Sequence, residues 1–400
     1  MVMQSPCSPT HVKANQTLNP SLLNVAITDA HATVHPEIIP VQIQVLGLVN
    51  VEIWTHNKMA TRLINDGVGT FGGELDLGSE PNGPIVMAVY AWNKPPGDNS
   101  YTVKLAAIMT LFVIGGKDAA IPTPVAAAGM KLKWSDEFNT LSATPCKQGT
   151  GTWPKCTQPT SSDGFTWYEN KPNGGDFGDS AYEHTDSHYN PYTIKNGFLR
   201  IRSQYDPNYV DPYGFNRHWR SGLLATAFPD GSTNVPMGNG YYEARILLPN
   251  AAASYNPQAS GGTWPAFWML TRNALQTNDA SGNLEEDIGE WYGVDPSSWQ
   301  SGQHVYAGAT GPNKRIFSGD PIGDLTWEFH RFGLLITDTT LTSYLDDKPY
   351  GSLAKGQLIG NVPIEWFVMI NLAMGSGFPV QPPPAGYYDM WIDYVEYYAP

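Results

Sequence analysis

Short runs in which apolar and polar residues alternate recur along the chain, bounded by Gly, Pro, Asn or Asp. Such alternation is typical of half-buried β-strands, because successive side chains point to opposite faces of a sheet. In the first part of the chain the strand-like runs lie at residues 41–45, 51–54, 83–91, 100–104 and 108–113. Their number and spacing predict a small immunoglobulin-like β-sandwich over residues 21–115.

The second part of the chain, residues 130–400, contains more of these runs and no long helical periodicity. They lie at residues 131–134, 198–202, 221–225, 240–248, 264–270, 284–292, 303–308, 330–336, 341–345, 366–373 and 390–397. So many strands predict two packed antiparallel sheets, an all-β jelly-roll sandwich of the concanavalin A-like type. We expect its inner sheet to curve into a long cleft.

Two stretches lack a pattern that a folded core can use. Residues 1–20 are polar and contain Pro, which predicts a disordered N-terminal segment. Residues 116–129 combine Pro with a run of Ala, which predicts a linker between the two domains.

The composition supports an all-β protein and suggests a kind of ligand. Gly (40), Pro (33), Tyr (21) and Trp (13) are abundant, whereas charged residues make up only 15%. Aromatic rings in excess of what a core needs suit sugar binding, because the apolar faces of pyranose rings stack on them. The first domain is therefore either a spacer or support, which we favour, or a carbohydrate-binding module that uses Trp54, Tyr90 or Trp92.

The charge balance limits which classes of polymer the chain can bind. With 37 acids, 23 bases and a formal net charge of -14, the chain is unsuited to nucleic acids and polyanions. A neutral polymer fits better. The longest apolar run, residues 105–114, is too short to span a membrane, and residues 1–19 have no apolar signal-peptide region. We expect an exported, soluble monomer from which any secretion signal has been removed or for which none was encoded.

The three cysteines suggest a disulfide rather than a metal site. Cys146 and Cys156 bracket a short Gly- and Thr-containing loop that can turn back on itself, which predicts a bond between them. Cys7 is left over. No pair has the C-x₂-C spacing of a metal site.

The stretch at residues 283–293 carries the clearest chemical signal. In a strand, Glu285 and Asp287 point the same way, and Glu290 joins them if Gly289 marks a bulge that adds one residue. Three carboxylates on one face repel one another, so one of them should hold a proton near neutral pH. Carboxyls of unequal proton affinity are what glycosidic-bond cleavage requires. The alternative is a solvated acidic surface, but the strand-forming neighbours of these acids argue against it.

Residues 131–400 resemble glycoside hydrolase family 16, which includes laminarinases, lichenases, agarases and κ-carrageenases. The resemblance rests on landmarks in the family's order: WSDEFN at 134–139, GYYEARI at 240–246, WPAFWML at 264–270, the Glu285-x-Asp287-x-x-Glu290 signature in its bulged form, and closing strands at 366–375 and 391–395.

The resemblance implies a retaining endo-glycosidase that needs no cofactor for catalysis. Glu285 is then the nucleophile and Glu290 the general acid/base, with Asp287 between them tuning their proton affinities. The bulged signature favours β-1,3 or mixed β-1,3/1,4-glucan as substrate. An agarase, a β-1,3-galactanase and a non-catalytic glucan-binding lectin on the same sandwich remain alternatives.

Other residues are implicated by position. The sugar-binding candidates are Trp264, Trp268, Trp291, His304, Asn371, Trp219 and Arg220, although each has a structural role as its alternative. Many family members bind a structural calcium, for which Glu137 and Asp393 are the matching positions.

Glu286 departs from the family, because its position is commonly aliphatic and faces the other sheet. Burial of a carboxylate there is costly unless it is paired or protonated. We expect a basic or amide partner, an irregular strand, or a shifted register that puts Glu286 in the cleft.

Overall fold

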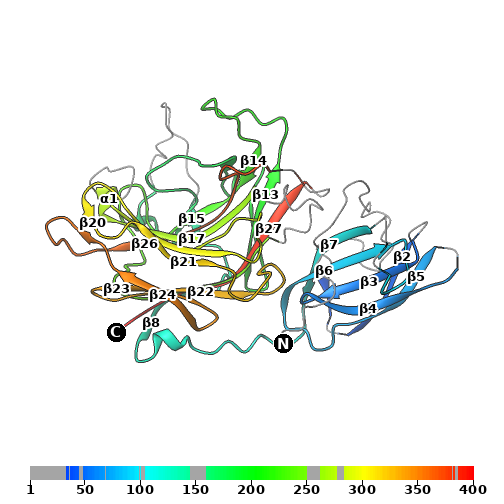
Figure 1. Ribbon diagram of the computed structural model, residues 1–400. Coiled ribbons are helices and arrows are strands. Elements are labelled where there is room, and N and C mark those ends of the chain that lie inside the picture. Colours follow the sequence, from blue (N-terminus) through cyan, green and yellow to red (C-terminus); the bar gives the residue numbers. More distant parts are fainter. Residues whose placement is uncertain are drawn as a thin grey trace. The chain divides into compact units, whose positions relative to one another are not determined.

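The computed structural model describes residues 33–35, 37–44, 48–67, 69–98, 100, 104–144, 159–249, 262–276, 283–380, 382 and 386–400. The described residues up to Ala120 form one compact unit, and those from Ile121 onward form a second (Figure 1). The predicted disulfide between Cys146 and Cys156 lies outside the described residues, as does the N-terminal segment 1–20.

The first unit has seven strands among its described residues, joined in the order β1-β7-β6-β3-β4-β5-β2. They are β1 (Thr33–Val34), β2 (Ile38–Gln44), β3 (Asn50–Thr55), β4 (Lys58–Asn65), β5 (Thr70–Asp76), β6 (Gly83–Trp92) and β7 (Lys104–Val113). β2 pairs with β5 along its whole length, whereas β4 and β5 pair over only two residues each, so the sheet turns back on itself there.

This curled sheet encloses one apolar core. Val51 and Ile53 of β3, Met87 and Val89 of β6 and Phe71 of β5 belong to the same buried cluster. Alternation in β3 and β6 puts these side chains on one face, as the pattern predicted. The immunoglobulin-like type of this unit stays a prediction.

The second unit contains twenty strands among its described residues. They are β8 (Lys131–Asp136), β9 (Ala143–Thr144), β10 (Trp167–Tyr168), β11 (Ser180–Tyr182), β12 (Tyr192–Lys195), β13 (Phe198–Tyr205), β14 (Trp219–Ser221), β15 (Leu223–Ala225), β16 (Gly240–Leu247), β17 (Thr263–Thr271), β18 (Leu284–Glu290), β19 (Trp299–Val305), β20 (Ala309–Thr310), β21 (Lys314–Gly319), β22 (His330–Ile336), β23 (Thr340–Leu345), β24 (Lys348–Ala354), β25 (Gln357–Leu358), β26 (Trp366–Met374) and β27 (Tyr387–Ala399). One short helix, α1 (Asn273–Gln276), and two 3-10 turns, Val125–Ala127 and Ser161–Asp163, complete the described elements.

Two large sheets dominate this unit, as the jelly-roll prediction requires. The first has the order β21-β19-β18-β17-β26-β15-β10-β9. The second has the order β11-β14-β13-β27-β16-β22-β23-β24, with β12 beside β13 and β8 beside β27. Figure 1 shows them as two layers, with β17 and β26 in one and β22, β23 and β24 in the other. β20 and β25 form a separate two-stranded sheet.

The core lies between these layers. Every residue of β26 is buried, which is why its sequence reads as a continuous apolar run rather than an alternating one. Trp291 packs on Phe332 of the opposite sheet with ring centroids 4.3 Å apart. The Ser301 and Ser343 hydroxyls, from β19 and β23, are 2.6 Å apart and join the layers through a buried hydrogen bond.

Part of the predicted linker packs on the second unit. Ala127 is buried against Tyr241 and Tyr398, and the Val125 backbone N–H donates to Asp347 at 2.9 Å. Among the described residues, no helix is long and apolar enough to cross a membrane.

Candidate active site

The register between β17 and β18 puts three acids on one face. Leu270 lies opposite Glu285, Trp268 opposite Asp287 and Ala266 opposite Glu290, and the register shifts by one residue between the last two pairs. The extra residue in β18 is Ile288, next to Gly289, so the bulge lies where the sequence suggested. Since Ala266, Trp268 and Leu270 share a face of β17, their three acidic partners share that face of β18.

Gly289 is required here by close packing. A Cβ atom at this position would lie 2.6 Å from the Trp291 ring and 3.3 Å from Trp299 Nε1. The strand therefore bulges where its inner face meets two indole rings and where only a glycine fits.

Glu285 is partly buried, whereas Asp287 and Glu290 are 6% and 9% exposed. Burial raises its pKa to about 7, and the neighbouring Asp287 carboxylate adds to the rise. The Tyr306 hydroxyl donates to Glu285 Oε2 at 3.1 Å and opposes the shift. Near neutral pH, both the protonated and the ionised form of Glu285 are therefore populated.

Asp287 and His304 form a pair beside Glu285. His304 Nε2 lies 3.2 Å from Asp287 Oδ2, and this contact raises the pKa of His304 above its ordinary value. Burial raises the pKa of Asp287 as well. Polar atoms of Glu285, Asp287 and His304 all lie within 4.8 Å of one another, so protonation of one group changes the affinity of the others for protons.

Glu290 is held by three donors. Trp264 Nε1 donates to its Oε1 at 2.9 Å and the Tyr292 hydroxyl to the same oxygen at 2.6 Å, whereas Arg315 donates to Oε2 at 3.2 Å. The Trp264 and Tyr292 rings stack with centroids 6.2 Å apart and planes 18° apart. This aromatic pair fixes the direction in which the carboxyl group points.

Aromatic and aliphatic side chains form the floor beside the acids. Trp268 is 8% exposed and donates through Nε1 to Asn371 Oδ1 at 2.8 Å, and Asn371 is fully buried. Phe177 packs edge-on against Trp264 at 5.4 Å and Trp268 at 6.1 Å. Of the predicted sugar-binding residues in this cluster, Trp264 is the half-exposed one. Asn371 lies opposite Ala266, on the face of the sheet that carries the acids, and its side chain holds the Trp268 ring; its contact with sugar stays a prediction.

Two other predicted sugar-binding tryptophans lie in the core. Trp291 is 3% exposed, on the inner face of the sheet, and Trp219 is 2% exposed, between Tyr205 and Tyr388. Alternation explains Trp291, because it follows Glu290 directly and so points away from the cleft. Neither ring offers a face on which a sugar can stack.

Arg220, which was also predicted to bind sugar, makes its contacts within the protein. Its guanidinium pairs with Glu183 and lies 3.6 Å from Asp206. It also lies between the Tyr189 and Tyr209 rings, at 4.4 and 4.0 Å from their centroids. These contacts indicate a side chain that stabilises the loops beside β14.

Glu286 lies between the sheets, opposite Met269 and Gln303. It is fully buried, and neither carboxyl oxygen has a hydrogen-bond partner among the described residues. Burial raises its pKa well above the ordinary value. The expected basic or amide partner is therefore missing from the described residues, and the register that would put Glu286 in the cleft does not occur.

The two predicted calcium ligands fit that metal poorly. Arg245 Nη1 lies 2.5 Å from Asp393 Oδ2, so a guanidinium already neutralises the carboxylate that calcium would need. Burial and then the Asp393 carboxylate raise the pKa of the neighbouring Glu137.

Three residues that contact the acids were not among the predictions: Tyr292, Tyr306 and Arg315. Tyr292 lies two residues after Glu290, so alternation puts both on the same face. Tyr306 lies two residues after His304, which is opposite Glu285, so alternation also puts Tyr306 on the face of its partner Glu285. Arg315 comes from β21, two strands away from β18, and its sequence neighbourhood carries no signal of this contact.

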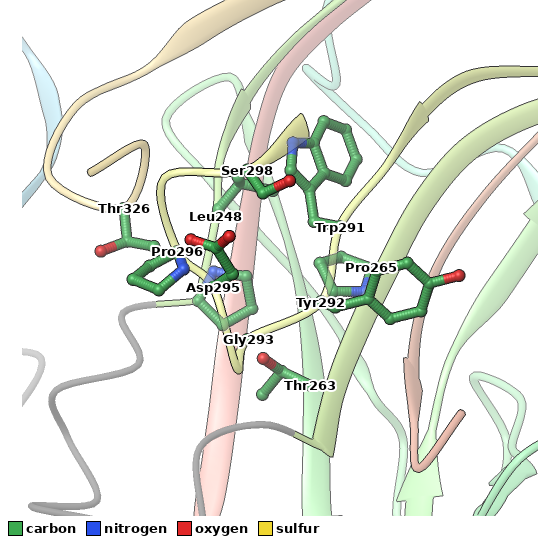
Figure 2. A pocket seen from close by; sticks show the side chains of 11 residues that line it. Leu248, Thr263, Pro265, Trp291, Tyr292, Gly293, Asp295, Pro296, Ser298 and Thr326 are labelled. Atoms are coloured by element: carbon green, nitrogen blue, oxygen red, sulfur yellow. The ribbon is translucent and has the colours of Figure 1, made fainter. Parts of the chain in front are cut away.

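A shallow pocket lies beyond the end of β18 (Figure 2). It is lined by Leu248, Pro249, Thr263, Pro265, Trp291, Tyr292, Gly293, Asp295, Pro296, Ser298 and Thr326. None of the three β18 acids reaches it, so we assign the active site to the cleft face of β18 instead.

The comparisons with known proteins point to one family. A model of the family "Glycosyl hydrolases family 16" matches residues 231–381, which include β18. The endo-1,3-1,4-β-glycanase EglC of Rhizobium meliloti is 27% identical over 278 residues, covering 66% of this chain and 51% of its own length. Glucan endo-1,3-β-glucosidase A1 of Niallia circulans is 27% identical over 276 residues, covering 64% of this chain and 36% of its own. The chain thus spans about half or less of these two relatives.

A solved structure supports the fold. It is a non-specific endo-β-1,3(4)-glucanase of family 16, crystallised with 1,3-β-D-cellotriosyl-glucose, with a TM-score of 0.50 and 21% identity over 70% of this chain and 97% of that one. The family model, the curated relatives and the fold agree that the second unit of this chain is similar to glycoside hydrolase family 16.

Proposed function

We propose that this chain is a retaining endo-glycosidase that hydrolyses β-1,3-glucan or mixed β-1,3/1,4-glucan. One observation carries the proposal: Glu285, Asp287 and Glu290 share the cleft face of a bulged strand. Different donors hold the outer two of these acids, Tyr306 for Glu285 and the Trp264, Tyr292 and Arg315 set for Glu290. Two carboxyls in different surroundings suit two different roles.

The reaction has two displacements. Glu285 attacks the anomeric carbon while the glycosidic bond breaks, and Glu290 gives its proton to the leaving oxygen. Glu290 then takes a proton from water, whose oxygen attacks the same carbon and releases Glu285. Two inversions at one carbon retain its configuration. Asp287, linked to His304, adjusts the proton affinity of Glu285 during both steps.

The choice of glucan rests on the relatives and on charge. The two curated relatives are named for action on 1,3-1,4-linked and 1,3-linked β-glucans. A net charge of -14 disfavours sulfated polymers, which need cationic anchors.

The test is product analysis on laminarin, lichenan, agarose and β-1,3-galactan. The wild type, Glu285→Gln and Glu290→Gln are compared, with the exposed Glu74→Gln as control. We expect oligosaccharides from laminarin or lichenan with the wild type and the control, and a loss of about 10³-fold or more in both site variants. A first-formed product with the β configuration, seen by NMR, supports retention. Products from agarose or galactan alone would reassign the substrate, and binding without products from any polymer would favour the lectin.

We further propose that the protein acts outside the cell as a monomer and without a cofactor. Cell fractionation and light scattering test the first two points. A structural calcium at Glu137 and Asp393 stays a prediction, although these two side chains are poor ligands for it. A melting temperature that falls when a chelator is added would support a bound calcium.

A further inference from the structure

Lys171 lies in the loop between β10 and β11, on the cleft side of the first large sheet. Two backbone hydrogen bonds fix its position: its N–H donates to the Asn170 side chain at 2.7 Å, and its carbonyl accepts from Gly174 at 2.8 Å. The side chain is half-buried. A lysine on an ordered turn presents its ammonium over a narrow range of positions.

The Lys171 ammonium lies over the aromatic floor of the active site. Its Nζ is 5.9 Å from the Phe177 ring centroid. Phe177 in turn packs edge-on against Trp264 and Trp268, and Trp264 donates to Glu290. Lys171 therefore lies beside the same aromatic cluster that holds Glu290 through Trp264.

The charge of Lys171 interacts with the Glu285 carboxylate, and no ion pair holds it among the described residues. Burial lowers the pKa of Lys171, while the Glu285 and Asp176 carboxylates oppose that shift. No hydrogen-bond acceptor or ion-pair partner for its Nζ occurs within residues 159–249, 262–276 and 283–380. The ammonium is not among the buried polar atoms that lack a partner, so solvent reaches it and a ligand can supply an acceptor there.

We propose that Lys171 is a substrate-positioning residue whose ammonium donates to a hydroxyl of the sugar ring held against Glu285, and whose charge favours the Glu285 carboxylate. The proposal rests on the glycosidase function given above. The other groups facing Glu285 are Asp287 and Glu290 from β18, His304 from β19, and Tyr306, which directly follows β19. Lys171 is the cation that approaches from the opposite side, out of the β10–β11 loop.

The test compares Lys171→Met, Lys171→Arg and a control, Lys133→Met, on the exposed face of β8. For Lys171→Met we expect kcat/KM on the preferred glucan to fall about ten- to a hundredfold, mainly through KM, because a charge-assisted hydrogen bond is lost. We also expect the acid limb of its pH profile to move to higher pH, since a cation beside Glu285 is removed. Lys171→Arg keeps the charge, so its kcat/KM should stay within a few-fold of the wild-type value. Lys133→Met should have the wild-type kcat/KM.

An unchanged KM and an unmoved acid limb in Lys171→Met, with the wild type active, overturn the proposal and leave the glycosidase function standing. If the wild type cleaves no polysaccharide, the glycosidase function itself fails. In that case the role of Lys171 is tested by calorimetric titration with laminari-oligosaccharides. The affinity of the Glu285→Gln variant is compared with that of the Glu285→Gln, Lys171→Met double variant. Weaker binding in the double variant supports the contact, and equal binding or none overturns it. Melting curves of each variant exclude a folding defect as the cause.

Discussion

At the scale of single residues, the acids of β18 differ because burial and hydrogen bonding act on them unequally. Glu285 has one hydroxyl donor, from Tyr306, and a pKa raised to about 7 by burial. Glu290 accepts from a whole set of donors: Trp264, Tyr292 and Arg315. The difference in surroundings, rather than the presence of acids alone, makes two chemical roles available on one strand.

The pH dependence follows from Glu285. Because a protonated carboxyl cannot attack, we expect kcat/KM on a soluble glucan to fall as the pH drops below about 7. The hydrogen bond from Tyr306 lowers the pKa of Glu285, so Tyr306→Phe should raise that pKa and shift the acid limb to higher pH. The measurement is the pH–rate profile of both proteins, with Tyr350→Phe as a matched control on β24. An acid limb that keeps its position in Tyr306→Phe would contradict this account.

Tyr292 is expected to matter through its hydroxyl. Tyr292→Phe keeps the ring that stacks on Trp264 but removes the 2.6 Å bond to Glu290. We expect kcat to fall about three- to tenfold with little change in KM, since one hydrogen bond that orients the acid/base is lost. Steady-state kinetics on laminarin checks this, again beside Tyr350→Phe. A variant with wild-type kcat would show that Trp264 and Arg315 suffice to hold Glu290.

At the scale of elements, β18 presents acids to both of its faces. Its cleft face carries the catalytic candidates, and its inner face carries Glu286, which is fully buried with both oxygens unpaired among the described residues. An unsatisfied buried polar group costs about 1–3 kcal/mol. The strand at the centre of the site is thus a weak point in the stability of the sandwich.

Replacing Glu286 should stabilise the fold. Its folded-state pKa lies well above the unfolded value near 4.3, so its presence destabilises the protein increasingly as the pH rises above that value. We expect Glu286→Met, of similar length, to raise the melting temperature at pH 7 by about 2–10 °C, and by less at pH 4. Calorimetric melts at the two pH values measure this, with the exposed Glu365→Met as control. A lower melting temperature at pH 7 would mean that Glu286 has a partner.

The same strand shows what a sequence can and cannot predict. The face shared by Glu285, Asp287 and Glu290 follows from alternation and a single glycine, because both are local properties. The Arg315 contact with Glu290 does not, because it depends on which strands become neighbours across the sheet. β21 and β24 were missed for a related reason: Lys, Pro and Gly interrupt their alternation, and they form strands because neighbouring strands pair with them.

At the scale of the whole molecule, the chain divides between residues 120 and 121, inside the predicted linker of residues 116–129. Residues 121–129 carry contacts that belong to the second unit: Ala127 is buried against Tyr241, and Arg331 NH1 donates to the Pro122 carbonyl at 3.1 Å. The first unit has its own core and no described acid cluster of the kind found in β18. Cleavage is therefore expected to stay with the second unit when the chain is cut, and polymer binding shows whether the first unit is a support or a binding module.

Two fragments test this division. Residues 121–400 should hydrolyse soluble laminarin at the rate of the full chain but bind insoluble β-1,3-glucan more weakly, if the first unit captures the polymer. Residues 130–400 should melt a few degrees lower than residues 121–400, because they lose the Ala127 packing and the hydrogen bonds at Val125 and Pro122. Binding is measured by sedimentation with insoluble glucan, hydrolysis by turnover of laminarin, and stability by melting curves. Equal sedimentation of the full chain and residues 121–400 would assign the first unit a supporting role, and equal melting of the two fragments would return the boundary to residue 130.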